Sequence, residues 1–252
     1  MVVSDFGRDQ SGRRFADLAI DEITTAGGRA VANYDSVITM AGGAAIVDAA
    51  VKAFGRVDVL VLPAGNYKER FLVDMTEEDW NLQINVNLNG HFTCIRAALP
   101  QLIKPRYGRI ITVASRAAFG RPRGGMAYSA AKSAVMGRHC ADVARAQAVR
   151  QGITVNCLLP SAKTTLFPKT EQRAGSPLLE SGSLDPAWIA PTVGYLCSDA
   201  ARGITGQFIY SSGTDVMVHH YPLSMQTILH KDGKWTVDEL AEAVPHLLSF
   251  RG

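Results

Sequence analysis

The sequence predicts a doubly wound α/β fold built on a mostly parallel sheet. Apolar runs rich in β-branched residues alternate with amphipathic helical stretches along the chain. Strands separated by helices imply right-handed crossovers, which produce a parallel sheet covered by helices on both faces. The composition agrees, because 252 residues with 47% hydrophobic and 19% charged side chains suit one large domain or two small ones.

The elements follow from hydrophobic periodicity. Apolar, β-branched runs predict strands at Met1–Ser4, Ala30–Asn33, Val57–Leu62, Arg109–Ala114, Thr154–Leu158 and Phe208–Tyr210. Apolar residues at helical spacing predict helices at Arg14–Thr25, Met40–Phe54, Trp80–Ile103, Tyr128–Arg150 and Pro186–Leu196. Because no repeat or linker divides the chain, we predict a single domain over residues 1–252.

One long stretch, Ser161–Asp185, shows no clear period and contains several Gly, Ser and Pro residues. Long irregular loops in a compact domain are more often lids or binding loops than accidents. We therefore expect this stretch to contact the substrate, although it carries no motif that identifies one.

Composition and charge argue against several classes of protein. The cysteines are far apart and form no CxxC pair, which favours a reducing compartment: Cys94, Cys140, Cys157 and Cys197. No apolar run approaches the roughly 18 residues that a membrane span needs, and charged Asp5, Arg8 and Asp9 interrupt the region of a secretory signal. The net charge of +3 is spread along the chain. We expect a cytoplasmic protein that binds neither membrane nor nucleic acid.

The histidines form no HExxH motif and no Cys/His cluster, so we interpret them as structural or surface residues and predict no metal site. They are His91, His139, His219, His220, His230 and His246.

The stretch from Gly108 to Val135 carries the strongest chemical signal. Tyr128 and Lys132 are four residues apart, so a helix places them one turn apart on the same face. Ser115 follows directly after a predicted strand, where open parallel sheets bind ligands. A lysine ammonium can stabilise a phenolate and lower the pKa of the tyrosine, while serine holds a substrate oxygen. The three residues together predict a proton-transfer site.

These residues resemble the short-chain dehydrogenase/reductase family, whose signature is a Ser followed by YxxxK. The stretch WNLQINVNLNGHF at Trp80–Phe92 is similar to the family's central helix, and Asn87 falls on its catalytic asparagine. ITVNCLLP at Ile153–Pro160 and SDAARGITGQFI at Ser198–Ile209 are similar to the segments leading to the nicotinamide loop and into the last strand. The resemblance implies a catalytic tetrad of Asn87, Ser115, Tyr128 and Lys132.

Within the family, the chain is most similar to the dehydrogenase units of multifunctional β-oxidation enzymes. The stretches GGRAVANYDSV, DVLVLPAG and KWTVDELAEAVP carry this similarity. It implies NAD-linked oxidation of a secondary alcohol, such as a 3-hydroxyacyl-CoA or a hydroxysteroid, on a Rossmann-like sheet. Lys132 would hold the nicotinamide ribose.

The resemblance also assigns the remaining cofactor contacts. Ala64, Gly65 and Pro160 belong to the cofactor site, and Thr164, or alternatively Thr165, supplies the hydroxyl that holds the carboxamide. Two departures affect this region. Leu62 and Pro63 stand where the family has two asparagines that tie the sheet near the cofactor, and Ser161 replaces the glycine that commonly follows Pro160.

The largest departure is at the start of the chain. Family members open with a strand, a glycine-rich turn and a helix that bind the pyrophosphate, whereas no two of the 23 glycines here are spaced as GxG. The run MVVSDFG resembles the family's second strand, so Asp5 would bind the adenosine ribose and favour NAD over NADP. Asp35 and Ser36 match contacts to the adenine edge. Gly7–Arg14 has GxxxxG spacing but lacks the following Lys and Ser/Thr of a P-loop.

We therefore expect the family's first strand and first helix to be missing, which leaves two explanations. Translation starts upstream of Met1, or the sheet closes by pairing the strand at Met1–Ser4 directly with the strand at Val57–Leu62 and cofactor binding is weakened. We favour the first explanation because the tetrad is intact. The absence of an in-frame glycine-rich turn upstream in the gene would contradict it.

Charged and apolar surface residues suggest partners. Arg116, Arg121 and Arg123, with Lys68 and Arg70, form either an ordinary solvated surface or a basic rim that binds an anionic substrate such as an acyl-CoA. The long predicted helices carry apolar residues beyond one stripe, and the resemblance implies that a second subunit covers them. We expect a homodimer or homotetramer. The sequence thus predicts an NAD-dependent alcohol dehydrogenase or ketone reductase, or else a non-catalytic relative that binds ligands or pairs with other subunits.

Overall fold

The computed structural model describes residues 1–119, 124–139, 151–164, 166, 184–219 and 236. The chain divides into two units, Met1–His219 and His220–Gly252, and the fold below is that of the first unit. A single domain over the full chain stays a prediction. Within the described residues, no helix is both long and apolar enough to cross a membrane.

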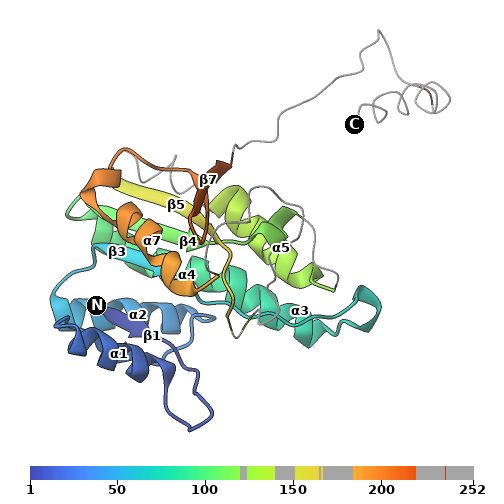
Figure 1. Ribbon diagram of the computed structural model, residues 1–252, viewed down its shortest axis with the longest axis horizontal. Helices are drawn as coiled ribbons and strands as arrows, with labels where there is room; N and C mark the ends of the chain where they lie inside the picture. Colours follow the sequence, from blue (N-terminus) through green and yellow to red (C-terminus); the bar gives the residue numbers. More distant parts are fainter. Residues whose placement is uncertain (120–123, 140–150, 165, 167–183, 220–235, 237–252) are drawn as a thin grey trace. The chain divides into compact units, whose positions relative to one another are not determined.

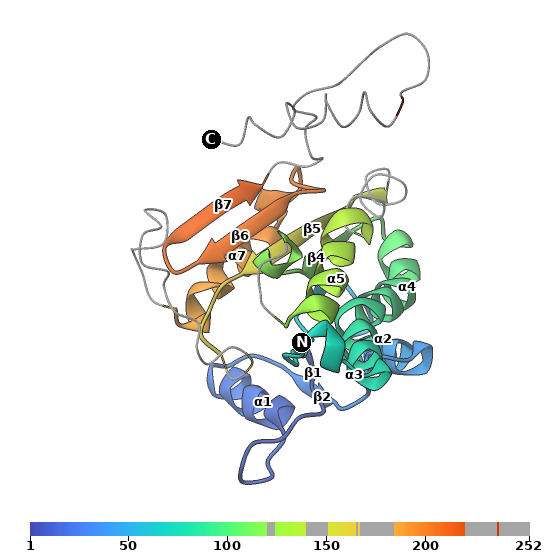
Figure 2. The same cartoon turned by 90° about the vertical axis from the view of Figure 1, so that its right-hand side faces the viewer.

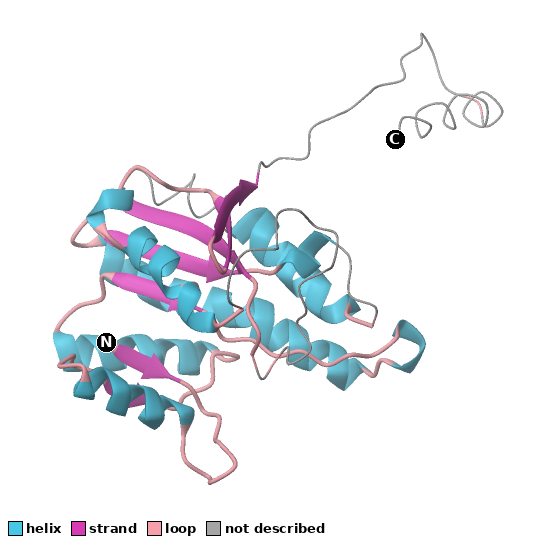
Figure 3. Cartoon of the chain, viewed as in Figure 1, coloured by secondary structure: helices cyan, strands magenta, loops and turns pink. Residues whose placement is uncertain are grey.

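A five-stranded sheet forms the centre of the first unit (Figure 3). Its strands, in spatial order, are β3 (Val59–Leu62), β4 (Gly108–Val113), β5 (Ile153–Pro160), β6 (Phe208–Ser212) and β7 (Asp215–His219). Neighbouring strands are parallel from β3 to β6, and β7 is antiparallel to β6. The predicted fold class, a mostly parallel Rossmann-like sheet, is confirmed.

Helices cover both faces of this sheet (Figures 1 and 2). Helix α7 (Ala190–Cys197) packs on one face, and α4 (Gly90–Ile103) and α5 (Met126–Ala134) lie on the other. Every residue of β4 is buried, as are all residues of β5 except the last. Strands covered on both faces are rich in apolar, β-branched residues, which explains why these two strands are clear in the sequence.

The first two strands form a separate sheet. Strand β1 (Val2–Ser4) pairs in parallel with β2 (Val31–Asn33), and no described strand pairs with the other edge of β1 or with the outer edge of β3. Direct pairing of the first strand with the strand that ends at Leu62 is therefore wrong. Helix α2 (Met40–Phe54) contacts β1, β2 and α4, and a Cβ on Gly43 would lie 2.8 Å from the backbone of Thr93. This close helix packing holds the two-stranded sheet where β1 does not meet β3.

The first two helices lie close to their predicted positions. Helix α1 spans Phe15–Thr25, and α2 has the predicted bounds. The Thr39 hydroxyl caps α2 by accepting a hydrogen bond from the Gly42 N–H at 3.0 Å. Gly55 ends the helix with a φ of 79°, the left-handed conformation that glycine adopts most easily.

The long predicted helix at Trp80–Ile103 is three segments. Helix α3 (Glu77–Ile84) begins earlier than predicted because the Thr76 hydroxyl accepts a hydrogen bond from the Asp79 N–H at 3.1 Å. A π-helical turn at Asn85–Asn89 then joins α3 to α4. Such turns insert one extra residue into a helix and are frequent at functional sites. Hydrophobic periodicity did not predict it.

Three further elements differ from the predictions. Strand β7 was not predicted, because its alternating half-buried pattern is typical of an antiparallel edge strand. The predicted helix from Pro186 begins as a short 3-10 turn, where the Asp185 carboxylate accepts from the Ala187 N–H at 2.8 Å. Helix α5 begins two residues before Tyr128 and continues as a π-helical turn at Val135–His139. Residues 140–150, the rest of that predicted helix, lie outside the described residues, as does most of the loop after Ser161.

Candidate active site

Tyr128 and Lys132 lie one turn apart on α5, and both are buried. Their side chains are only 5% and 3% exposed, so they are not the surface pair that this spacing commonly produces. The Lys132 ammonium nitrogen is 5.6 Å from the centre of the Tyr128 ring. The Tyr67 ring packs edge-on against Tyr128 at 5.4 Å between centroids. The tyrosine is therefore held in a fixed position between a cation and an aromatic ring.

Ser115 lies two residues after the end of β4 and reaches the same tyrosine. Its hydroxyl oxygen accepts a hydrogen bond from the Ala117 N–H at 3.1 Å, and the Ser115 side chain is hydrogen-bonded to the Tyr128 phenol. The predicted meeting of Ser115, Tyr128 and Lys132 is thus found in the structure. Two hydroxyls in contact beside a buried amine can pass a proton to or from a substrate oxygen.

The pKa values of this group are governed by burial. Burial lowers the pKa of Lys132 to about 8. Burial also raises the pKa of Tyr128 above its ordinary value, although the Ser115 hydrogen bond opposes this effect and the neighbouring Tyr67 adds to it. The expected lowering of the tyrosine pKa by Lys132 is therefore wrong for this structure. Burial is the largest cause of both shifts, because it penalises the charged form of each group.

The Lys132 ammonium is held by the backbone of the central sheet. Its nitrogen donates a hydrogen bond to the Val113 carbonyl oxygen at 2.8 Å. Val113 is the last residue of β4. The end of this strand therefore positions the Lys132 ammonium, and Ser115 follows it by two residues. The sequence did not single out Val113, because a backbone contact leaves no signature in the side-chain pattern.

Asn87 is fully buried in the π-helical turn and points its amide group toward the loop after β3. Its amide nitrogen donates to the Asn66 carbonyl at 2.9 Å, the Asn66 side-chain oxygen at 2.6 Å and the Gln83 carbonyl at 2.9 Å. The Asn87 side-chain oxygen is buried and has no hydrogen-bond partner in the described part of the chain. An acceptor left in this state calls for a donor from a ligand or a water.

Gly65 lies directly beside that acceptor. A Cβ at Gly65 would lie 2.9 Å from the Asn87 side-chain oxygen and 3.8 Å from the Lys132 nitrogen. The absence of a side chain at this position therefore keeps the backbone close to both a buried acceptor and an ammonium. A ribose hydroxyl, which both donates and accepts hydrogen bonds, can bond to such an ammonium. Ala64 precedes Gly65 in the same exposed loop.

The residues predicted to hold the adenosine follow the strands of the smaller sheet. Asp5 is exposed after β1 and accepts a hydrogen bond from the Gly7 N–H at 2.6 Å. Asp35 follows β2 and accepts from the Asn33 side-chain amide at 2.7 Å, and the Ser36 hydroxyl accepts from the Ile38 N–H at 3.5 Å. These three residues follow the strands of the two-stranded sheet, whereas Ser115 of the tetrad follows a strand of the five-stranded sheet.

The other predicted cofactor residues follow the central sheet. Pro160 is the last residue of β5, and Thr164 is exposed four residues further along the chain. Thr165 lies outside the described residues. The carboxyl ends of parallel strands are the ordinary site of ligand binding in open α/β sheets, and Pro160 is at such an end.

The predicted basic rim is only partly described. Lys68 and Arg70 both contact the Asp79 carboxylate, with 3.4 Å between the Arg70 Nε and an Asp79 oxygen. The hydrogen bond from Lys68 is the main reason that the pKa of Asp79 is lowered. The single Asp79 carboxylate offsets only one of these two charges, and both cations stay about half-exposed, so their place in a substrate-binding rim stays a prediction. Arg116 lies over the Tyr210 ring at 5.5 Å, and Arg121 and Arg123 lie outside the described residues.

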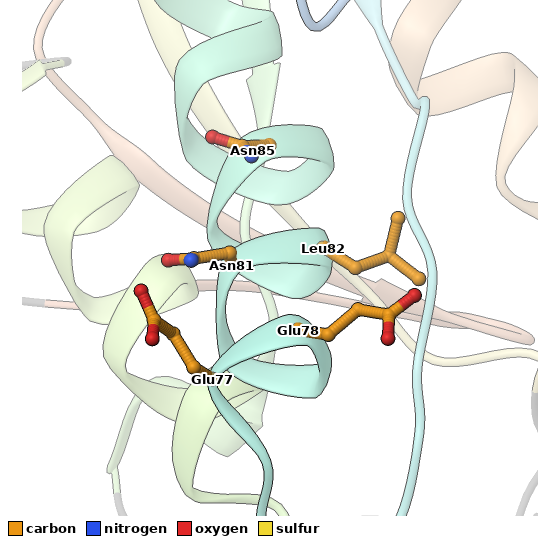
Figure 4. Close-up of a pocket in the computed structure, with 5 residues that line it drawn as sticks. All are labelled: Glu77, Glu78, Asn81, Leu82 and Asn85. Atoms are coloured by element: carbon orange, nitrogen blue, oxygen red, sulfur yellow. The ribbon is translucent and has the colours of Figure 1, made fainter.

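A pocket of about 530 Å³ lies on α3, away from the tetrad. Figure 4 shows its lining side chains on successive turns of that helix: Glu77, Glu78, Asn81, Leu82 and Asn85. The pocket contains none of the predicted catalytic or cofactor residues and is open to solvent, so it adds no chemistry to the site.

Comparison with known proteins identifies what this arrangement is similar to. The profile of the short chain dehydrogenase family matches residues 10–174. Peroxisomal multifunctional enzyme type 2 of Drosophila melanogaster is 39% identical over 216 residues, covering 84% of this chain and 34% of that protein. A hydroxy(phenyl)methylsuccinyl-CoA dehydrogenase subunit of Thauera aromatica is 35% identical over 202 residues, covering 77% of this chain and 79% of that protein.

The structural comparison agrees. A crystal structure of a short chain dehydrogenase from Mycobacterium avium has a TM-score of 0.84 and 32% identity, covering 98% of this chain and 85% of that one. The chain spans between about a quarter and a half of the length of the peroxisomal relatives that it matches. Other relatives of this chain are matched over most of their length, as the Thauera subunit shows.

Proposed function

Because the chain belongs to the short-chain dehydrogenase family of oxidoreductases, we propose that it interconverts a secondary alcohol and a ketone with NAD(H) as cofactor. The observation that carries this proposal is the buried contact of Ser115 and Tyr128 beside Lys132. Family membership favours an enzyme over a non-catalytic relative.

The nicotinamide ring supplies the hydride acceptor or donor when the cofactor is bound. Lys132 would hold its ribose beside Gly65, where the Lys132 nitrogen lies 3.8 Å from the position of a Cβ on that glycine. Asp5 would accept hydrogen bonds from the adenosine ribose. A carboxylate at this position favours NAD, because it would repel the additional phosphate of NADP.

The protein side chains supply the proton chemistry. Ser115 positions the substrate oxygen, and Tyr128 takes its proton during alcohol oxidation or returns one during ketone reduction. Lys132 is charged below pH 8, so its ammonium favours the phenolate that forms when Tyr128 gives up its proton. Asn87, with its unpaired oxygen, supports a water that connects Lys132 to solvent.

We infer that the substrate is a 3-hydroxyacyl-CoA or a hydroxysteroid. The Thauera relative is named as a CoA thioester dehydrogenase, and the peroxisomal relatives are named as multifunctional enzymes and hydratase-dehydrogenase-epimerases. We also propose a homodimer or homotetramer, because Phe92 and Leu82 expose 48% of their surface along the α3–α4 helical stretch. A cytoplasmic location stays a prediction.

A non-catalytic binding protein is the second candidate, since the sequence contains no GxG turn for the pyrophosphate. Titration with NADH, followed by cofactor fluorescence, separates the two candidates. The enzyme should bind NADH with a Kd in the micromolar range and oxidise a 3-hydroxyacyl-CoA in the presence of NAD. No saturation up to millimolar NADH and no turnover with either NAD or NADP would support the non-catalytic protein.

A substitution at Gly65 tests the location of the ribose site. Gly65→Ala places a methyl group 2.9 Å from the Asn87 oxygen, in the space assigned to the cofactor. We expect kcat/KM for NAD to fall by at least about tenfold, because a displacement of about 1 Å in an active site can cost about 100-fold. Gly194→Ala is the matched control, since a Cβ there meets no atom within 4 Å. Equal kinetics for the two variants would contradict this location.

A further inference from the structure

We propose that His91 is a positioning residue for Lys132, acting through the last residue of β4. This inference rests on the proposed function, because it concerns the lysine of the same site. The imidazole Nε2 of His91 accepts a hydrogen bond from the Val113 N–H at 3.3 Å. The carbonyl of the same residue, Val113, accepts the hydrogen bond from the Lys132 ammonium at 2.8 Å.

The geometry of the sheet explains why a side chain is needed at this point. Strand β3 ends at Leu62, which is paired with Thr112, so Val113 lies one residue beyond the paired part of the ladder. Ala114, the next residue, bonds instead to Leu158 on β5. Val113 therefore extends past the end of β3, and its two backbone groups are taken by side chains: the N–H by His91 and the C=O by Lys132.

The loop after β3 has no polar side chain with which to hold this position. Leu62 is apolar, and Pro63 follows it without a backbone N–H. These two residues stand where the resemblance places asparagines that tie the sheet near the cofactor. In this chain the corresponding hydrogen bond is made by a side chain of α4, His91, which lies one helical turn after Asn87. His91 thus takes over a contact that the sequence of the loop after β3 cannot make.

The imidazole of His91 can accept the Val113 N–H in only one protonation and tautomeric form. His91 is 2% exposed, and a backbone N–H can bond to Nε2 only when that nitrogen carries no proton. Neutral His91 with its proton on Nδ1 is therefore the form that holds Val113. Because one residue carries both contacts, a shift of the Val113 backbone moves the carbonyl that holds the Lys132 ammonium.

Two nearly isosteric variants isolate the acceptor. His91→Gln can place its amide oxygen where Nε2 lies, whereas His91→Met fills a similar volume without such an acceptor. We expect His91→Met to lower kcat by at least about tenfold with little change in KM for the alcohol, because an active site tolerates little displacement. His91→Gln should stay within about threefold of the unsubstituted enzyme on the same reasoning.

A second measurement follows Lys132 directly and needs no turnover. NMR of lysine labelled at Cε gives the midpoint of the Lys132 titration. The carbonyl contact favours the ammonium, so His91→Met should lower that midpoint by about half a pH unit, while His91→Gln should not. The titratable groups beside Lys132 are Tyr128 on its own helix and Cys157 on β5, and neither residue is changed in these variants.

The control is Ile95→Ala. Ile95 is a buried apolar residue one turn further along α4, so this substitution removes packing and leaves the polar contacts unchanged. Ile95→Ala should lower Tm without moving the Lys132 midpoint. If His91→Met does not fold, His91→Asn replaces it, because the shorter asparagine side chain does not bring its amide oxygen within hydrogen-bond distance of the Val113 N–H. Equal kcat and equal Lys132 midpoints for the Gln variant and the variant without a well-placed acceptor would overturn the proposal. Absence of turnover in the unsubstituted protein would instead reject the proposed function and leave the titration as the test of His91.

Discussion

Tyr128→Phe is expected to lower kcat for alcohol oxidation by between about 100-fold and 10,000-fold, the range that general acid–base catalysis contributes. The phenol is the group in the described site that can take the substrate proton while in contact with Ser115. Phenylalanine keeps the ring and its edge-on packing against Tyr67, so the loss is chemical. Steady-state kinetics with NAD and a 3-hydroxyacyl-CoA measure the effect.

The fold should survive this substitution. The tyrosine is 5% exposed, and the loss of one hydroxyl hydrogen bond costs about 1 kcal/mol of unfolding free energy. NADH affinity should change little, because the ribose contact assigned to Lys132 remains. Tyr67→Phe removes a hydroxyl from the adjoining ring and should retain nearly full kcat. If Tyr128→Phe were as active as Tyr67→Phe, the assignment of the acid–base residue would be wrong.

The central sheet could be predicted because burial imposes a simple pattern. Strands β4 and β5 are buried along nearly their whole length, and most of their residues are apolar or β-branched. Strand β7 lies at an edge of the sheet and alternates between half-buried and exposed residues, a pattern of burial that depends on its tertiary position. The π-helical turn at Asn85–Asn89 keeps helical hydrophobic spacing on both sides, so the sequence reads as one helix.

The relation between the two sheets could not be predicted from strand patterns. Strand patterns allow β1 to pair with β3, whereas the structure pairs β1 with β2 alone and packs α2 against α4. Register and pairing depend on contacts between distant segments, which a single sequence does not reveal.

The tetrad residues could be located because spacing fixes them. A four-residue interval on a helix and a serine after a strand are local features, and the structure brings Ser115, Tyr128 and Lys132 together. Their pKa values could not be predicted, because burial depends on the tertiary fold. His91 was interpreted as structural or surface. Two features of the sequence point to a positioning role for His91: it lies one turn after Asn87, and Leu62 is apolar.

Lys132→Met is expected to abolish turnover and at the same time to stabilise the fold at pH 7. The lysine is 3% exposed, and the fall in its pKa from 10.5 to about 8 corresponds to roughly 3 kcal/mol of unfavourable burial of the ammonium. Methionine has a similar length and no charge. The substitution also removes the hydrogen bond to the Val113 carbonyl, and this loss cancels about 1 kcal/mol of the stability gained by removing the buried charge. The net gain in unfolding free energy should be about 1 to 2 kcal/mol.

The pH dependence identifies the cause of this gain. The folded protein releases the Lys132 proton near pH 8, whereas the unfolded chain keeps it up to about pH 10.5. Between these values the unfolded state binds more protons, so the unfolding free energy of the unsubstituted protein rises with pH. Lys132→Met lacks this rise. Its advantage should therefore be largest below pH 8 and should shrink as the pH approaches 10.5.

Denaturant unfolding at pH 7, 9 and 10 measures the difference between the two proteins. Lys52→Met, which replaces an exposed lysine on α2, is the control and should show no pH-dependent difference from the unsubstituted protein. If Lys132→Met is instead less stable at pH 7, the contact with Val113 outweighs the cost of burying the charge. The site would then be a stabilising part of the fold. If it is more stable and inactive, the chain keeps a buried ammonium at a cost in stability, as expected of a residue retained for catalysis.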